Sequence, residues 1–274
     1  MIEEFAVPGA RLHTETHGSG PLLLLIHGGN GDSASFDGIV GPLAEHVTVL
    51  TYVRRGFVRS PLDVPPAGAG RIAADVEDAA ALICAHGGEA LVFGSSSGAI
   101  VALDLVTRHP DLVRVVVVHE PPILELLDDP GAWAARFAGI RARYEAEGLM
   151  PALAEFGTAV GLTRPAVPVG EPSPGRLAMM GRVPQNMGFW FEHEFESYPA
   201  YRPDVAALGA VADRIVPAVG RTSRETDAMP CRPNVRLAQR LGREIVEFPG
   251  GHIGYDEQPE EFAAELLRLL RAGR

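Results

Sequence analysis

Strand-like runs rich in apolar residues alternate with amphipathic segments along most of this chain. The apolar runs lie at residues 21–26, 47–53, 90–93, 112–119, 214–220 and 243–248. Runs this short are typical of strands buried on both faces of a parallel sheet. Segments with helical spacing of apolar residues lie between them, at 33–45, 71–86, 99–109, 229–241 and 259–271. The alternation predicts an α/β fold with a doubly wound, mostly parallel sheet, and residues 3–16 predict an edge strand or hairpin.

The alternation stops at Pro121 and resumes only near residue 204. The stretch between favours helices and one proline-rich loop, with helices at 133–147, 150–161 and 185–198 and the loop at 164–175. We therefore expect a core domain of residues 1–120 and 204–274, with residues 121–203 inserted as a helical cap. Because the insertion follows a strand, we expect the cap over the carboxyl edge of the sheet, where open α/β sheets carry their sites.

One tight turn, Gly94-Ser95-Ser96-Ser97-Gly98, lies between an apolar strand and a helix. It matches the pattern G-x-S-x-G with Ser96 at the centre. A strand-to-helix turn this sharp strains the central residue and leaves room only for small neighbours, which lifts the serine hydroxyl clear of the sheet. The alternative is a plain glycine and serine loop, but the strand before it and the helix after it favour Ser96 as a nucleophile.

Composition removes several classes of function. The net charge is −11, which argues against nucleic acid as a partner. The 24 Lys and Arg residues are all arginine, so mechanisms that need a P-loop lysine or a Schiff-base lysine are excluded. The two cysteines give no disulfide framework, the first residues lack the apolar stretch of a signal peptide, and no apolar run is long enough to span a membrane. We expect a cytoplasmic protein without membrane contact, as a monomer or a dimer.

Three further motifs accompany the serine turn in a fixed order. His27-Gly28-Gly29 follows an early strand, Arg55-Gly56 with Ser60 follows the next one, and Gly251-His252 follows the last. Together with the turn at Ser96, they resemble the α/β-hydrolase fold superfamily with a helical cap, over essentially the whole chain. The resemblance implies that nucleophile, acid and histidine follow one another in that order along the chain.

Each catalytic role falls on a residue that could perform it. A serine hydroxyl needs a base in hydrogen-bond contact, and His252 can supply one because a turn after the last strand reaches over the sheet edge. Attack on an acyl carbon places negative charge on oxygen, which needs N–H donors. The resemblance takes these oxyanion donors from Ser97, directly after the nucleophile, and from Gly29, directly after His-Gly.

The orienting acid is where the sequence departs from the superfamily. Most members carry an aspartate three residues after a glycine like Gly220, and here that position is Ser223. We expect Glu120 to be the acid, because it directly follows a strand and strand ends are rigid. Asp227 or Glu225 in the later loop is the alternative, and a histidine without an orienting acid is the third possibility.

Aromatic residues are frequent in the predicted cap, which indicates a largely apolar pocket. We expect Asn30, Phe189, Trp190 and His193 to contact the substrate. His193 and the glutamate after it lack the second histidine of the zinc motif H-E-x-x-H, and no cluster has metal-ligand spacing, so we expect neither a metal nor a cofactor.

The leading hypothesis is a serine hydrolase of the esterase type. Its small-molecule substrate is a largely apolar ester, lactone or thioester, cleaved through an acyl-enzyme at Ser96. One alternative is a cofactor-free lyase, cyclase or acyltransferase on the same fold, and another is a non-catalytic binder that uses the cap pocket. An intact Ser96 and His252 argue against the binder. A serine nucleophile also argues against dehalogenases and epoxide hydrolases, which use a carboxylate at that position.

Overall fold

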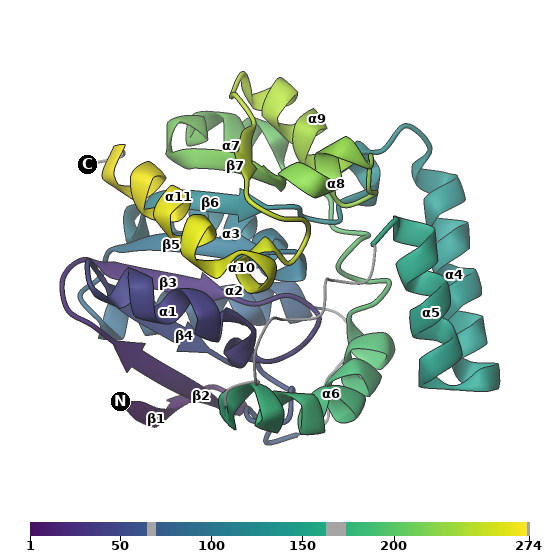
Figure 1. Cartoon of the computed structure of the whole chain (residues 1–274), viewed down its shortest axis with the longest axis horizontal. Helices are drawn as coiled ribbons and strands as arrows, with labels where there is room; N and C mark the ends of the chain where they lie inside the picture. The colour runs from purple at the N-terminus through teal and green to yellow at the C-terminus, as the bar shows by residue number, and fades with distance from the viewer. Residues whose placement is uncertain (65–69, 163–173, 273–274) are drawn as a thin grey trace.

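The computed structural model describes residues 1–64, 70–162 and 174–272, and its sheet is the central layer (Figure 1). The sheet has eight strands in the order β1-β2-β4-β3-β5-β6-β7-β8. They are β1 (Ile2–Val7), β2 (Ala10–His17), β3 (Leu22–Ile26), β4 (Thr48–Tyr52), β5 (Ala90–Ser95), β6 (Val113–His119), β7 (Ile215–Gly220) and β8 (Val246–Phe248). β1 and β2 form a hairpin and β2 pairs antiparallel with β4, whereas all pairs from β4 to β8 are parallel. The predicted doubly wound, mostly parallel sheet is confirmed.

Helices cover both faces of this sheet. The long ones of the core are α1 (Asp37–Ala44), α2 (Arg71–Ala85), α3 (Ser97–Arg108), α9 (Cys231–Leu241) and α11 (Pro259–Ala272). Figure 1 shows α1 and α11 in front of the sheet and α2 and α3 behind it. Successive strand residues face opposite sides, so Leu23 and Leu25 share a core cluster with α1 and α11, whereas Leu24 and Ile26 share one with α2 and α3. This two-sided burial is why the strands carry apolar residues at nearly every position.

Short helices complete the core, and most of them were not predicted from the sequence. They are η1 (Ser33–Phe36), η2 (Pro110–Leu112), η4 (Ala212–Arg214), α7 (Val205–Ala210), α8 (Arg221–Glu225) and α10 (Gly254–Glu257). The helix predicted at 33–45 is divided into η1 and α1. The N-cap of η1 is Asp32, whose side chain accepts a hydrogen bond of 3.1 Å from the Ala34 N–H.

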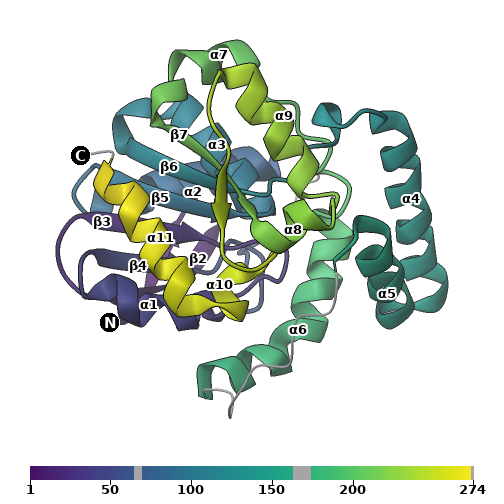
Figure 2. The ribbon, with the colours of Figure 1, turned by 45° about the horizontal axis from the view of Figure 1, so that its top comes forward.

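Three helices of the inserted segment lie together on one side of the sheet (Figures 1 and 2). They follow the short η3 (Leu124–Leu126) and are α4 (Pro130–Glu147), α5 (Leu149–Val160) and α6 (Pro174–His193). Their apolar faces share one core cluster with Val53 and Phe57, which follow β4. The segment therefore packs against the loops at the carboxyl ends of the strands, and its role as a separate cap domain stays a prediction.

The helix predicted at 185–198 has different bounds in the structure. α6 begins at Pro174 and ends at His193, with Pro184 inside it. Pro184 does not end this helix, although proline inside a helix usually interrupts it. After His193 the chain turns, and the Phe195 N–H donates a hydrogen bond of 2.8 Å to the Trp190 carbonyl. Most of the loop predicted at 164–175 lies outside the described residues, and its last two residues belong to α6.

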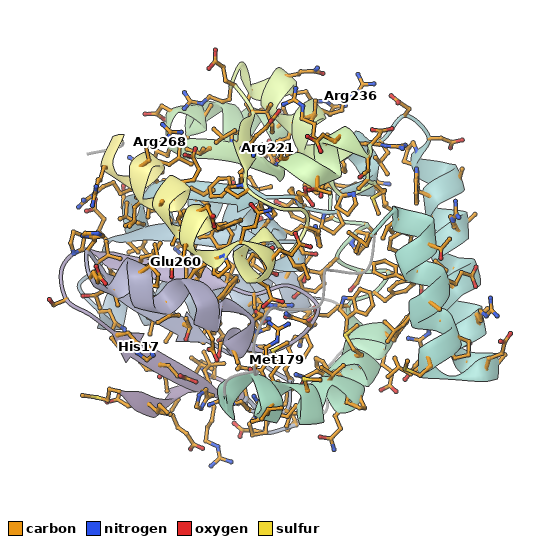
Figure 3. All side chains as sticks on the ribbon, in the orientation of Figure 1. His17, Met179, Arg221, Arg236, Glu260 and Arg268 are labelled. Atoms are coloured by element: carbon orange, nitrogen blue, oxygen red, sulfur yellow. The ribbon has the colours of Figure 1, made fainter. Side chains whose placement is uncertain are left out.

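Charged side chains lie on the outer faces of the helical layers. Figure 3 shows Arg236 on α9 and Arg268 on α11 at the periphery, and their side chains are 51% and 61% exposed. Arg236 pairs with Asp128 and Arg268 pairs with Glu265. Ion pairs this exposed to solvent contribute little to the stability of the fold. Among the helices that the structure describes, none combines the length and the apolar character needed to cross a membrane.

Candidate active site

Ser96 occupies the turn between β5 and α3. β5 ends at Ser95 and α3 begins at Ser97, which leaves Ser96 with φ 56° and ψ −126°. A non-glycine residue in such a conformation costs on the order of 1–3 kcal/mol, and the surrounding packing must maintain it. A Cβ on Gly94 would lie 2.6 Å from the Gly98 carbonyl oxygen, and one on Gly98 would lie 2.3 Å from a carbonyl oxygen of β3. Both glycines are therefore required for the turn that presents Ser96.

Glu120 and His252 meet at the same edge of the sheet. Glu120 directly follows β6, and its Oε2 lies 2.6 Å from Nδ1 of His252 in the turn after β8. Its Oε1 accepts a hydrogen bond of 2.8 Å from the Gly220 N–H, and the residue is fully buried. Burial alone would raise the pKa of Glu120, but the hydrogen bond and charge of His252 outweigh it and lower the pKa. The carboxylate is thus ionised and fixed against the imidazole.

The other carboxylates considered from the sequence lie on the surface. Asp227 is 73% exposed and forms an ion pair of 2.7 Å with Arg232. Glu225 is exposed at the end of α8. Of these three acids, the structure brings Glu120 into hydrogen-bond contact with His252. Ser223, where most superfamily members carry aspartate, is buried close to Gly251.

A cavity of about 180 Å³ opens beside Ser96 and His252. The loop of residues 28–30 and Ser97 also line it. Its walls are largely apolar and include Phe137, Phe156, Leu162, Met187, Trp190 and Met229. Most of these wall residues belong to the inserted segment, so the cavity lies between that segment and the carboxyl edge of the sheet. Such a site suits an uncharged, apolar group held close to the serine.

The predicted substrate contacts are divided between this cavity and its surroundings. Asn30 and Trp190 line the cavity. Phe189 and His193 do not: Phe189 packs on Phe57 with ring centroids 5.1 Å apart, and His193 packs on Phe189 at 4.6 Å. The reason is helical spacing, because residues 189 and 193 share one face of α6 while 190 lies on another. Met187 also lines the cavity and was not predicted from the sequence, although its position three residues before Trp190 puts both side chains on one face of α6.

The predicted oxyanion donors, Gly29 and Ser97, both line the cavity beside Ser96. Ser97 is the first residue of α3, where amide N–H groups have no partner within the helix. A Cβ on Gly28 would lie 2.9 Å from the Cβ of Ser96, and one on Gly29 would lie 2.4 Å from Nε1 of Trp190. Glycine at both positions lets this backbone run between the serine and the cavity wall.

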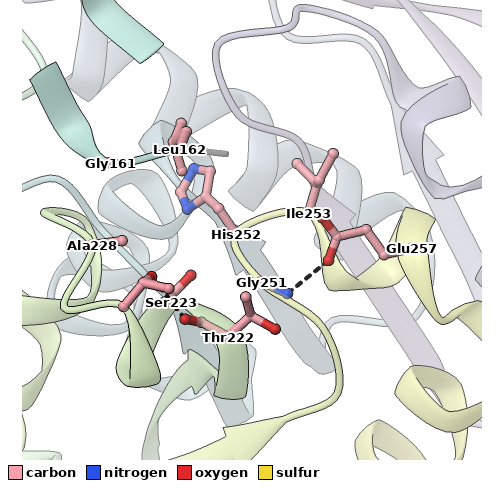
Figure 4. A pocket seen from close by; sticks show the side chains of 10 residues that line it. Gly161, Leu162, Thr222, Ser223, Ala228, Gly251, His252, Ile253 and Glu257 are labelled. Atoms are coloured by element: carbon pink, nitrogen blue, oxygen red, sulfur yellow. Dashed lines mark hydrogen bonds between the residues drawn. The ribbon is translucent and has the colours of Figure 1, made fainter. Parts of the chain in front are cut away.

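A second hollow of about 270 Å³ adjoins the first and shares Leu162, His252 and Ile253 with it (Figure 4). Figure 4 shows the His252 ring beside Leu162, and the Gly251 N–H donating a bond of 2.7 Å to Oε2 of Glu257. This bond ties the turn that carries His252 to α10. Neither hollow is a metal site: over residues 1–64, 70–162 and 174–272, no group of three His, Cys, Asp or Glu side chains could hold a metal ion.

His119 lies directly before Glu120, and its side chain forms no hydrogen bond within the described residues. Its ring is fully buried, and neither ring nitrogen has a hydrogen bond. The rings of Phe248 and Phe262 lie 6.0 and 5.7 Å away. Burial lowers the pKa of His119 from 6.5 to about 4, so this residue stays neutral in the folded protein.

We expect His119 to make stability pH-dependent. Between pH 6.5 and about 4 the unfolded chain binds a proton at His119 and the folded chain does not, so stability falls as the pH falls. Between about pH 7.5 and about pH 5, His119 alone should lower the free energy of unfolding by about 2 kcal/mol. His119→Leu should remove that part of the slope, as measured by urea unfolding at both pH values. The matched variant His109→Gln, at a partly exposed histidine, should keep the full slope, and equal slopes in both variants would contradict this role of His119.

Comparison with known proteins assigns this chain to a family. Residues 23–265 match the family model described as the alpha/beta hydrolase family. YraK of Bacillus subtilis, described as an uncharacterised hydrolase, is 36% identical over 271 residues, which are 96% of this chain and 94% of YraK. The 2-(acetamidomethylene)succinate hydrolase of Mesorhizobium japonicum is 33% identical over 117 residues, 42% of this chain and 41% of that protein.

Solved structures agree on the fold. A thermophilic esterase from Thermogutta terrifontis has a TM-score of 0.74 at 19% identity, and the match covers 100% of this chain and 99% of the esterase. A hydrolase from Pseudomonas aeruginosa has a TM-score of 0.70 at 21% identity, with 98% of each chain covered. Because the family model spans most of the sequence and YraK is similar over nearly its whole length, this chain is an enzyme of the alpha/beta hydrolase family.

Proposed function

We propose that this enzyme is a serine hydrolase that cleaves a largely apolar ester, lactone or thioester through an acyl-enzyme at Ser96. The observation that carries the proposal is the bond of 2.6 Å between His252 Nδ1 and the buried Glu120, at a cavity that Ser96 also lines. A carboxylate at Nδ1 favours the tautomer whose Nε2 is free to accept a proton. The group that needs such an acceptor at this edge of the sheet is the Ser96 hydroxyl.

The proposed reaction gives a role to Ser96, His252, Glu120, Gly29 and Ser97. Ser96 Oγ attacks the acyl carbon while His252 Nε2 takes the hydroxyl proton, and Glu120 stabilises the imidazolium that forms. The negative charge that develops on the acyl oxygen is met by the N–H groups of Gly29 and Ser97. The imidazolium then protonates the leaving alcohol or thiol, and water repeats the sequence to release the acid and free Ser96.

The walls of the cavity support an apolar acyl group. They are built largely from aromatic and aliphatic side chains of the inserted segment, together with Met229 and Ile253. A carboxylate in the acyl portion would lose its hydration against Phe137, Phe156 and Met187 without gaining a partner there. The fold likeness to an esterase supports the same class of reaction.

Partitioning to methanol tests the acyl-enzyme without requiring it to accumulate. Esters with one acyl group and different leaving groups should give the same ratio of methyl ester to free acid, because all pass through one acyl-Ser96 intermediate. A ratio that changes with the leaving group would contradict a common intermediate. Exclusive transfer to added alcohols, with no acid formed in water, would favour the acyltransferase alternative.

Narrowing the cavity should change acyl selectivity. Met187→Trp places a larger side chain against the cavity wall, so we expect kcat/KM for p-nitrophenyl hexanoate to fall by at least tenfold more than for the acetate. The control is Met180→Trp, at a methionine of the same helix that is 58% exposed. Steady-state kinetics on both esters measures the effect, and equal losses on hexanoate and acetate would show that this cavity does not hold the acyl group.

A further inference from the structure

Arg54 is a fully buried arginine that the sequence analysis did not single out. It lies two residues after β4, and its guanidinium forms ion pairs with Asp75 of α2 at 2.6 Å and with Glu194 at 2.8 Å. Glu194 directly follows α6, so this ion pair joins the core to the inserted segment. Burial would lower the pKa of Arg54, but Glu194 and Asp75 hold it well above its ordinary value. The group is therefore a permanent buried cation, and Asp75 and Glu194 balance its charge, with Glu194 accepting from both Nη1 and Nη2.

The same guanidinium also contacts the two segments that carry the proposed oxyanion donors, in part through the Nη2 that binds Glu194. Its Nε donates to the His27 carbonyl at 3.1 Å. Its Nη2 donates to the Gly28 carbonyl at 3.3 Å and to Ser97 Oγ at 3.1 Å. One planar group thus touches both segments, the glycine loop after β3 and the first turn of α3.

His27 adds to the same arrangement. The backbone N–H of Arg54 donates to His27 Nε2 at 2.9 Å, so Nδ1 carries the ring proton and donates to the Gly28 carbonyl at 2.8 Å. Burial lowers the pKa of His27 to about 3, which keeps the ring neutral and this tautomer in place. The Gly28 oxygen therefore accepts from Arg54 Nη2 and from His27, whose tautomer Arg54 fixes, in addition to the Gly31 N–H of its own turn at 3.3 Å.

The Gly28 carbonyl and the Gly29 N–H are two ends of one peptide group. A trans peptide is planar, and its C=O and N–H point in opposite directions. Holding the Gly28 oxygen against Arg54 therefore fixes the direction of the Gly29 N–H on the opposite side. Donors at the oxygen also polarise the amide and strengthen the N–H as a donor.

We propose that Arg54 is a positioning residue that aims the Gly29 N–H and holds Ser97 for the oxyanion, and that Glu194 keeps Arg54 in that orientation. This inference builds on the proposed function, because it concerns the oxyanion of the same reaction. It assigns the inserted segment a second task besides forming the cavity wall. The carboxylate that this segment supplies sets the geometry of the charge-stabilising groups about the serine.

Arg54→Lys tests the proposal while keeping a positive charge beside Asp75 and Glu194. Lysine has one ammonium and no planar fork, so it cannot reach the Gly28 oxygen, Ser97 and Glu194 together. We expect kcat on p-nitrophenyl acetate to fall by about 10- to 100-fold, with KM changed by less than about threefold. The rate is expressed per active site titrated with a fluorophosphonate, so loss of folded protein does not count as loss of rate.

A second readout separates aiming of the N–H from a merely structural role. A trifluoromethyl ketone adds to a serine and forms a tetrahedral oxyanion, so its affinity should fall by the same factor as kcat. The matched control is Arg55→Lys, since Arg55 instead pairs with Asp78 through an Nε bond of 2.7 Å. This control should keep kcat within about twofold of the wild type.

Three results would overturn the proposal. They are an unchanged kcat per titrated site in Arg54→Lys, a lower kcat with unchanged affinity for the ketone, and an equal loss in Arg55→Lys. If Arg54→Lys does not fold, Glu194→Gln replaces it, with a fall in kcat of about tenfold and an unchanged KM expected. A full kcat in Glu194→Gln would then overturn the proposal. Failure of the wild type to react with the fluorophosphonate is a different result, because it contradicts the proposed function itself.

Discussion

Ser96→Ala should abolish turnover of p-nitrophenyl acetate, lowering kcat by about 10⁶-fold. The substitution removes only the hydroxyl group, and the proposed mechanism has no other nucleophile to replace it. The turn should remain intact, because it is imposed by Gly94 and Gly98 and by the packing of β5 and α3. Thermal unfolding should therefore show a melting temperature close to that of the wild type, and steady-state kinetics gives the loss of rate.

Residual activity in Ser96→Ala separates the hypotheses. A variant that keeps more than about a tenth of kcat would contradict the acyl-enzyme, because removal of a triad serine costs far more than tenfold. If the wild type itself turns over no ester and the variant binds small apolar molecules equally well, the non-catalytic binder becomes the better account. A control substitution at exposed Ser197, Ser197→Ala, should leave kcat unchanged.

Glu120→Gln should lower kcat by about 10³- to 10⁴-fold while changing KM little. The hydrogen bonds of Glu120 explain how the substitution would act. The Gly220 N–H donates to Oε1 of Glu120, so the introduced glutamine would turn its carbonyl oxygen toward Gly220 and its NH₂ group toward His252 Nδ1. That amide would donate to Nδ1 and leave the proton on Nε2, the nitrogen that must accept the proton of Ser96.

The matched control for this substitution is Asp227→Asn, the same chemical change at the alternative acid. Asp227 is 73% exposed and its carboxylate pairs with Arg232, so kcat should stay within about twofold of the wild type. Both variants are compared by kcat, KM and melting temperature. A large loss in Asp227→Asn beside a retained rate in Glu120→Gln would reassign the orienting acid. Retained rates in both would indicate a serine and histidine dyad.

The core of the fold could be predicted from sequence because its signals are local. A buried parallel strand such as 21–26 is apolar at nearly every position, and a turn such as 94–98 needs its two glycines for steric reasons. The bounds of α6 could not be predicted in the same way. Pro184 lies inside this helix, whereas a proline usually marks the end or the first turn of a helix. Short helices such as α8 and α10 have too few residues to show a helical period.

The candidate site could be proposed from sequence only as far as chain order and residue chemistry allow. Ser96, Gly29 and His252 follow motifs on known elements, but the contact of Glu120 with His252 joins residues 132 positions apart. The sequence could rank Glu120 above Asp227 by the stiffness of a strand end, without showing that its carboxylate faces Nδ1. The burial of Arg54 could not be predicted from the sequence, because an arginine is usually exposed and this one pairs with Glu194 from a distant segment.

The central claim is that Ser96 is an activated nucleophile, and fluorophosphonate labelling tests it most directly. The probe reacts irreversibly with activated serines and needs neither the natural substrate nor accumulation of an intermediate. We expect one label per chain, found by peptide mapping on Ser96 and lost in Ser96→Ala. Label on Ser95 or Ser97, or no label on a folded wild type, would contradict the account.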